Sequence, residues 1–223
     1  MNDLIAVNGE SIDAVLMDYS CGQPAITLYY NSASNAVLPK QHGIKYGFRP
    51  LSVILEVTGT DRDDVTGKIS ALTALFSAQS EISLPDGLTY TSVLTDVSEL
   101  EFYTEDDAEI TYTFAAARHG PEQTLTSTGP ASVQVVGTAQ TDAVISFKVP
   151  DSGAASVCGI NFVGLTPGAA IVIDGRNKTI TQNGENAFLL SDLTAFPQLQ
   201  PGENALDITA GLTVTLKYYP MYL

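Results

Sequence analysis

The sequence predicts a mainly β protein with two domains, and three observations support this fold class. Residues 131–223 contain short apolar strand patterns separated by turn clusters. Residues 1–120 contain strand patterns and one helical pattern, and the polar residues 121–130 between the two parts have neither period. We therefore expect an N-terminal β-domain with one packed α-helix, a linker at 121–130, and a C-terminal β-sandwich or jelly roll.

The N-terminal domain is predicted from a strand that leads into a helix. Leu51–Val57 has apolar residues at alternate positions, as a half-buried strand requires. Thr60 and Asp63 then have the spacing of a capping box, which marks the start of a helix. The helix has one apolar stripe, formed by Val65, Ile69, Leu72 and Phe76.

After the helix the pattern returns to strands. Hairpin strands are expected on either side of the turn sequence LPDGL, Leu84–Leu88. An acidic turn is expected at Glu105–Asp107, followed by a strand in which Ile110, Tyr112 and Phe114 share one face.

The stretch Asn31–Arg49 has a weaker pattern and is predicted to be a long loop. It contains three basic residues, Lys40, Lys45 and Arg49. Long segments of this kind are often functional in compact domains, and the alternative is a solvated surface loop.

The C-terminal domain is predicted from about eight short strands with turns between them. The expected strands are Ala131–Val136, Ala143–Val149, Ser156–Val163, Ala170–Asp174, Lys178–Thr181, Ala187–Leu190, Ala205–Thr209 and Thr213–Tyr219. Near its end, LQPGENALDI indicates a structural turn at Pro201, Gly202 and Asn204. Proline presets the dihedral at the second position of a type II turn, and glycine supplies the positive φ at the third.

Charge and composition restrict the partners. The formal net charge is −15, from 25 acidic and 10 basic residues, which argues against a nucleic-acid partner. No run reaches the ~20 apolar residues of a membrane span, so no membrane partner is expected. The N-terminus lacks a signal-peptide pattern, which predicts synthesis in the cytoplasm. Cys21 and Cys158 are interpreted as buried free thiols, with a disulfide or a reactive site as the alternatives.

The sequence contains no recognisable catalytic, cofactor-binding or metal-binding motif, so we predict no site of these kinds and no enzyme activity. Asp61, Asp63 and Asp64 are interpreted as a helix N-terminus rather than as cation ligands. Glu105–Asp107 is interpreted as a hairpin tip. A hydrolase with a pair of carboxylates in a cleft is the remaining enzymatic alternative.

The order of features resembles the distal tail (Dit) proteins of long-tailed bacteriophages and prophages. The similar segments are VNGESID, FRPLSVILEVTGT with the helix after it, ISLPDGLTYTSVLTDVSELEF, and FPQLQPGENALDITAGLTVTLKYYPMYL. Each segment is short, but together they cover most of the chain in the family's order.

This resemblance implies a virion structural protein without cofactors, located in the phage tail. Members of the family form rings, generally hexamers, through the N-terminal domain. The ring is a hub that joins the tail tube protein to tail-tip or baseplate proteins. The resemblance also implies that the C-terminal sandwich is galectin-like, a fold shared with carbohydrate-binding modules. A cell-surface polysaccharide-binding module or adhesin is therefore the alternative function. However, the chain has no Trp, and no His after residue 119, which puts a sugar site in doubt.

Ring assembly brings strongly acidic subunits together, and positive charge at the seam would reduce their repulsion. Lys40, Lys45 and Arg49 are therefore the candidate residues of the subunit interface.

Overall fold

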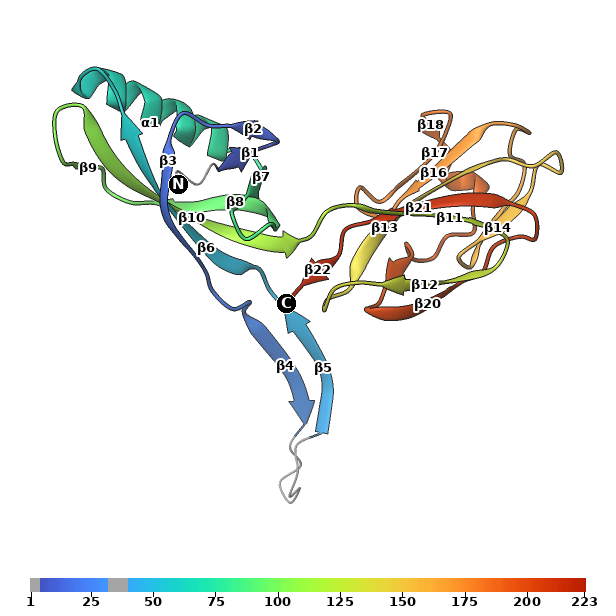
Figure 1. Ribbon diagram of the computed structural model, residues 1–223. Coiled ribbons are helices and arrows are strands. Elements are labelled where there is room, and N and C mark those ends of the chain that lie inside the picture. Colours follow the sequence, from blue (N-terminus) through green and yellow to red (C-terminus); the bar gives the residue numbers. More distant parts are fainter. Residues whose placement is uncertain (1–4, 32–39) are drawn as a thin grey trace. The chain divides into compact units, whose positions relative to one another are not determined.

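The structure is a computed structural model that describes residues 5–31 and 40–223. The chain divides into two compact units, drawn in Figure 1. The N-terminal unit comprises residues 1–119 together with Leu223, and the C-terminal unit comprises Gly120–Tyr222. Both units are built mainly of strands, and the described residues contain one α-helix. The predicted fold class is therefore confirmed.

The N-terminal unit consists of a twisted antiparallel sheet, a helix and a separate hairpin. Its strands are β1 (Ala6–Val7), β2 (Glu10–Ser11), β3 (Val15–Cys21), β4 (Ile26–Asn31), β5 (Lys40–Tyr46), β6 (Arg49–Thr58), β7 (Ser80–Ser83), β8 (Thr89–Val97), β9 (Glu101–Phe102) and β10 (Asp107–His119). The strand order in the sheet is β2-β1-β7-β8-β10-β6-β3, and β9 pairs with β10. Strands β4 and β5 pair only with each other among the described strands.

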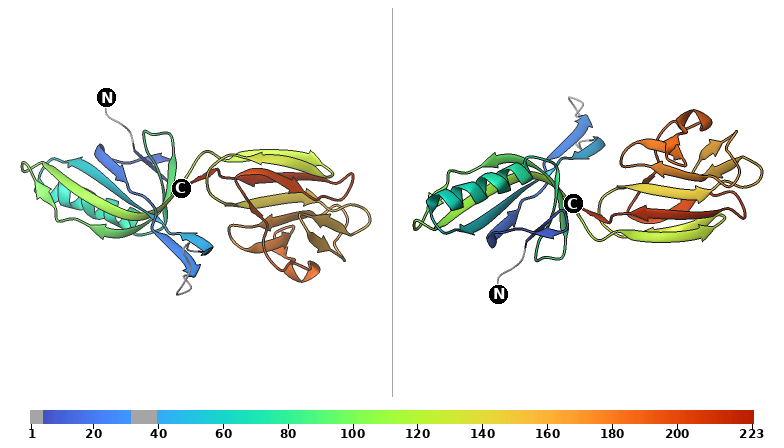
Figure 2. Two further views of the ribbon diagram at one scale, coloured as in Figure 1. Left: turned by 90° about the horizontal axis from the view of Figure 1, so that it is seen from below. Right: turned by 90° about the horizontal axis from the view of Figure 1, so that it is seen from above.

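Helix α1 (Arg62–Phe76) lies along one face of this sheet, as Figure 2 shows. Its buried residues are Val65, Ile69, Leu72 and Phe76, so the predicted apolar stripe is confirmed. The ring of Phe76 contacts Tyr112 and Phe114 of β10, with centroid distances of 4.8 and 5.2 Å. No helix of the described residues is long and apolar enough to cross a membrane.

The helix cap is shifted by one residue from the predicted position. Asp61 is the N-cap, and its Oδ1 accepts a hydrogen bond from the backbone N of Asp64 at 2.9 Å. In return, Oδ2 of Asp64 accepts a hydrogen bond from the backbone N of Thr60 at 2.9 Å. The prediction that Thr60 and Asp63 form the box was wrong. A carboxylate is among the best N-cap acceptors, and Asp61 occupies that position.

The C-terminal unit is a β-sandwich. Its elements are β11 (Gln123–Thr128), β12 (Ala131–Val135), β13 (Thr141–Lys148), β14 (Ala155–Val157), β15 (Ile160–Phe162), β16 (Ala170–Asp174), β17 (Thr179–Gln182), β18 (Glu185–Asn186), the 3₁₀ turn η1 (Phe188–Leu190), β19 (Gln198–Leu199), β20 (Gly202–Leu206), β21 (Thr213–Tyr218) and β22 (Met221–Tyr222). The larger sheet has the order β11-β21-β13-β16-β17-β18, and β19 pairs with β13. The pairs β12–β20 and β14–β15 supply further strands, and one apolar core contains buried residues from all three groups.

The predicted linker at 121–130 is wrong for most of its length, because Gln123–Thr128 forms β11. All six residues of β11 pair with β21, from Gln123 opposite Tyr218 to Thr128 opposite Thr213. The segment has one apolar residue, Leu125, but three threonines, and β-branched residues favour strands. It therefore forms the edge of the C-terminal sheet.

Two other strands predicted in the C-terminal unit differ from the observed structure. Ser156–Val163 contains two short strands, β14 and β15, because Cys158 and Gly159 both have positive φ, 52° and 78°, and make a two-residue hairpin turn. Ala187–Leu190 is mostly the 3₁₀ turn η1 rather than a strand. The side chain of Asn186 accepts a hydrogen bond from the N of Phe188 and starts this turn.

Candidate assembly surface

The clearest candidate for a functional surface is the hairpin β4–β5, which we call the arm. Strand β3 leads into it and β6 follows it, and Figure 1 shows it projecting from the sheet of the N-terminal unit. At its base, the backbone N of Gly47 donates to the O of Ala25 at 2.7 Å. The expected long loop is thus partly a strand, since Lys40–Tyr46 forms β5. Residues 32–39 of that prediction lie outside the described residues.

The register of the arm gives it one apolar face. Ile26 lies opposite Tyr46, and Leu28 lies opposite Ile44. Tyr30 is the next residue on the same face of β4, because side chains alternate along a strand. These five side chains are 40–60% exposed. An isolated two-stranded hairpin is only marginally stable in water, so an arm with this face uncovered is the kind of surface that binds a partner.

The opposite face of the arm carries the lysines. Lys45 lies opposite Thr27, and Lys40 lies opposite Asn31. Lys40 and Lys45 are both exposed, as a role at a subunit interface requires. They share their face with Tyr29, which is 54% exposed, so the arm has one apolar face and an opposite face that carries two lysines and one aromatic side chain. Their role at an interface stays a prediction.

Arg49 does not belong to this surface. Its side chain is 4% exposed, and Nη1 donates to the backbone O of Gly22 at 2.8 Å. The backbone N of Gly22 also donates to the O of Pro50 at 2.8 Å. The expectation of an exposed Arg49 at the seam is corrected: the guanidinium fixes the base of the arm from inside.

The bend at Pro201 and Gly202 in the C-terminal unit has the positive dihedral expected of its glycine. Gly202 has φ = 94°, which confirms its positive dihedral. Oδ1 of Asn204 accepts from the N of Gln200 at 2.9 Å, and its Nδ2 donates to the O of Gln200 at 2.7 Å. Pro201 is exposed between them. Asn204 therefore closes the turn with its own side chain.

The remaining polar groups singled out from the sequence have structural roles. Asp61 and Asp64 cap helix α1, and Asp106 accepts a hydrogen bond from Thr104 in the predicted acidic turn. Both cysteines are free, as expected, but they are partly buried rather than buried. Burial and the charge of Asp207 raise the pKa of the Cys158 thiol to about 11. Among the described residues, no group of three or more His, Cys, Asp or Glu could hold a metal ion.

A second exposed apolar surface lies in the C-terminal unit. Leu189 in η1 is 96% exposed, Phe188 is 42% exposed, and nearby Val163 is 67% exposed. The loop after η1 is fixed by Asp192, whose two carboxylate oxygens accept from the side chain and backbone N of Asn161, both at 2.7 Å. These hydrogen bonds lower the pKa of Asp192.

Sequence reasoning located the lysines but missed the apolar face. The signal was present, since Ile26, Leu28 and Tyr30 alternate in the segment ITLYYN. It was not used because the second strand of the hairpin lies in a stretch that looks polar and contains glycine.

Residues 126–222 match the family model described as siphovirus-type tail component, C-terminal domain. A search of curated protein sequences gave no match.

Solved structures resemble the whole chain. The Dit protein (gp 19.1) of SPP1, described as a paradigm of the hub adsorption apparatus in phages that infect Gram-positive bacteria, has a TM-score of 0.77 at 16% identity and 99% coverage of both chains. A chain of the phage P2 baseplate, in its activated conformation with Ca, has a TM-score of 0.59 at 10% identity, covering 99% of this chain and 98% of the other. A chain of the same baseplate in its activated conformation with Sr has a TM-score of 0.60 at 10% identity, with 97% coverage of both chains.

Proposed function

Because residues 126–222 match the model of the siphovirus-type tail component family and the whole chain has the fold of a Dit hub protein, we propose that this protein is a distal tail hub of a long-tailed phage or prophage. In this role it is a structural protein of the virion tail. It forms a ring of identical subunits, with six as the expected number. The ring joins the tail tube protein on one side to tail-tip or baseplate proteins on the other.

The exposed apolar face of the arm is the observation that supports self-association best. Five large side chains, including Leu28 and Ile44, lie uncovered on a hairpin that has no other strand beside it among the described residues. Covering them with another protein removes apolar surface from water, at roughly 25 cal/mol per Å². A projecting element that contacts a different surface of the next subunit makes a heterologous interface, which forms a closed ring when the rotation from one subunit to the next closes.

The alternative function, a polysaccharide-binding adhesin, has less support. The two polar side chains offered by the turn at Gly202 are engaged within the C-terminal unit. Glu203 accepts a hydrogen bond from Oγ of Ser132 at 2.8 Å, and Asn204 bonds to the turn backbone.

Sedimentation velocity on the full chain over a range of concentrations tests the proposal. We expect wild-type protein to assemble into one closed species and Leu28→Ser/Ile44→Ser to remain monomeric. Val136→Ser is the matched control, because Val136 is 56% exposed in the C-terminal unit and Leu28 is 52% exposed in the arm. Electron microscopy of the wild-type species should show rings. A wild-type chain that stays monomeric at every concentration, alone and with the tail tube protein, would contradict the hub function.

A further inference from the structure

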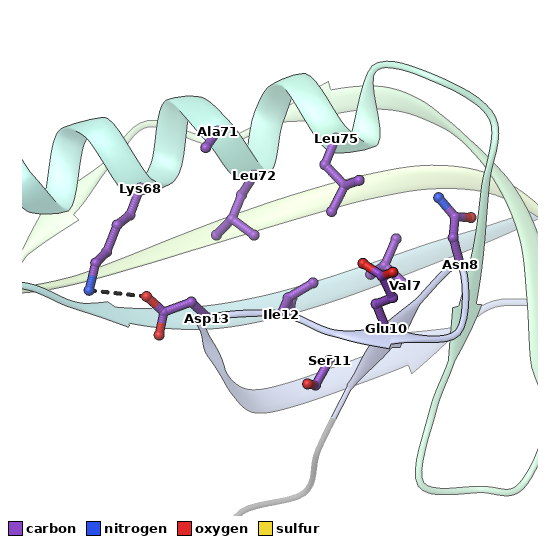
Figure 3. Close-up of a pocket in the computed structure, with 10 residues that line it drawn as sticks. All are labelled: Val7, Asn8, Glu10, Ser11, Ile12, Asp13, Lys68, Ala71, Leu72 and Leu75. Atoms are coloured by element: carbon purple, nitrogen blue, oxygen red, sulfur yellow. Dashed lines mark ion pairs between the residues drawn. The ribbon is translucent and has the colours of Figure 1, made fainter.

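A groove in the N-terminal unit lies between helix α1 and the hairpin β1–β2. Its volume is about 560 Å³. Figure 3 shows Leu72 and Leu75 pointing from the helix toward Val7 and Ile12 on the opposite wall. Ala71 also lines the groove and is exposed. The groove therefore has an apolar interior that is open to solvent.

The rim of this groove is acidic. At one end Lys68 forms an ion pair with Asp13, with Nζ and Oδ2 3.2 Å apart, and lies 3.9 Å from the carboxylate of Asp64. Glu10 is exposed and also lines the groove. Glu10 lies at the other end of the groove, away from Lys68 (Figure 3), so the groove lining carries two carboxylates and one ammonium group and keeps a net negative charge.

The arm has the complementary charge. No acidic residue occurs between Asp18 and Glu56, although the chain has 25 acidic residues in total. Within that interval lie Lys40 and Lys45, both exposed. The arm is thus a positively charged element with an apolar face, in a strongly acidic protein.

The dimensions of the two surfaces also agree. From Lys68 to Leu75 the helix rises about 10 Å. On the arm, paired side chains such as Leu28 and Ile44 lie about 5 Å apart, and Ile26 and Leu28 are about 7 Å apart along the strand. The four side chains of the two pairs therefore cover an area that fits over the groove.

The arm of the same chain does not cover this groove. Figure 1 shows the arm projecting away from helix α1 within the N-terminal unit. No residue of β4 or β5 is among those that line the groove. A second copy of the chain can supply the arm.

We infer that the apolar face of the arm of one subunit binds the groove between α1 and β1–β2 of the next subunit. This inference rests on the proposed ring and identifies the surface that receives the arm. Ile26, Leu28, Ile44 and Tyr46 face the groove. The two lysines lie on the outer face of the arm, so their attraction to the acidic rim is long-range and is screened over a Debye length of about 10 Å at 0.1 M salt.

Blocking the groove without disturbing the helix tests the inference. Ala71→Trp places a large side chain in the groove from an exposed position. Ala74→Trp is the control, since Ala74 is exposed on the same helix and does not line the groove. We expect Ala71→Trp to raise the concentration for half-assembly at least tenfold and Ala74→Trp to leave it unchanged. Circular dichroism spectra of the two variants should both match the wild type.

Mixing two defective variants gives the sharper result. Leu28→Ser/Ile44→Ser has an intact groove, and Ala71→Trp has an intact arm. If the arm binds the groove, an equimolar mixture should form dimers that cannot extend, whereas each variant alone stays monomeric. If Ala71→Trp assembles like the wild type while the arm variant does not, the arm binds elsewhere: the inference is overturned and the proposed hub function stands. A wild-type chain that never assembles overturns both.

Discussion

Gly202 allows a quantitative test of the turn that closes the C-terminal sandwich. Its φ is 94°, and a Cβ built on this residue would meet no atom within 4 Å. Any cost of substitution therefore comes from the backbone and not from a clash. Holding a β-branched residue in such a conformation costs about 1–3 kcal/mol, so Gly202→Val should destabilise the C-terminal unit by that amount. Gly202→Asn should cost less, because Asn adopts positive φ more readily.

Gly67 is the matched comparison for this experiment. It is exposed in helix α1, its φ is not positive, and a Cβ there also meets nothing within 4 Å. Gly67→Ala should therefore stabilise the N-terminal unit by about 0.5–1 kcal/mol, the difference in helix propensity.

Differential scanning calorimetry on the full chain measures both effects. A change of 1 kcal/mol shifts the Tm of a domain of up to 100 residues by about 4–8 °C, so Gly202→Val should lower the transition of the C-terminal unit by at least several degrees. Gly67→Ala should raise the transition of the N-terminal unit. The reasoning is refuted if Gly202→Val and Gly202→Asn both melt like the wild type, because the turn then does not depend on a positive dihedral.

Four further outcomes are expected. In a Cys21→Ser background, iodoacetamide should modify Cys158 at pH 8 about 100-fold more slowly than it modifies an ordinary thiol. A thiol pKa of about 11 in place of 9 leaves about a hundredth of the reactive thiolate. A rate equal to that of an ordinary thiol would contradict the raised pKa. Because the pKa of Asp192 is lowered, its carboxylate stabilises the fold above the ordinary pKa of Asp, and this stabilisation is lost as pH falls through the lowered value. Asp192→Ala should therefore flatten the decline of Tm between about pH 5 and pH 2. An unchanged slope of Tm against pH would exclude this role. Lys40→Glu/Lys45→Glu should weaken self-association at low salt, with a difference from wild type that shrinks as salt is added; equal association at low salt would exclude an electrostatic role for the two lysines. Gly175→Ala should destabilise the C-terminal unit in a urea titration, because its Cβ would lie 2.6 Å from the backbone O of Ala143, and wild-type stability would show that this contact relaxes without cost.

The parts of the fold that could be predicted are those with a strong local period. The apolar stripe of α1 and the alternation of β6 depend on residues within one element, and both were predicted from spacing alone. Strand β11 was missed because its partner, β21, is about 90 residues away and because only Leu125 marks it as apolar. In η1 the apolar run Phe188–Leu190 looked like a buried strand, yet Leu189 is almost fully exposed.

The candidate surface shows the same limit. Lys40 and Lys45 were noticed as charges, but the face on which they lie follows from the pairing of β4 with β5, and the Ser- and Asn-containing residues between the two strands predicted a loop without fixing that pairing. Arg49 was assigned to the subunit interface with the two lysines because all three are bases in one stretch of an acidic chain. Its long side chain instead reaches back to the O of Gly22, a contact between residues 27 apart that no local pattern indicates.

The pairing of β11 with β21 has a mechanical consequence. Gln123 lies opposite Tyr218, and the N of Gly120 donates to the O of Pro220 at 2.9 Å, so the chain enters and leaves the sandwich at the same end. Hydrogen bonds between antiparallel strands run perpendicular to the strands. Tension between these two chain ends would therefore load the bonds of β11 one after another, like a zipper, instead of all together in shear. Under a pull from its own attachment points, the sandwich would yield first at β11, while β13, β16 and β17 keep their pairing.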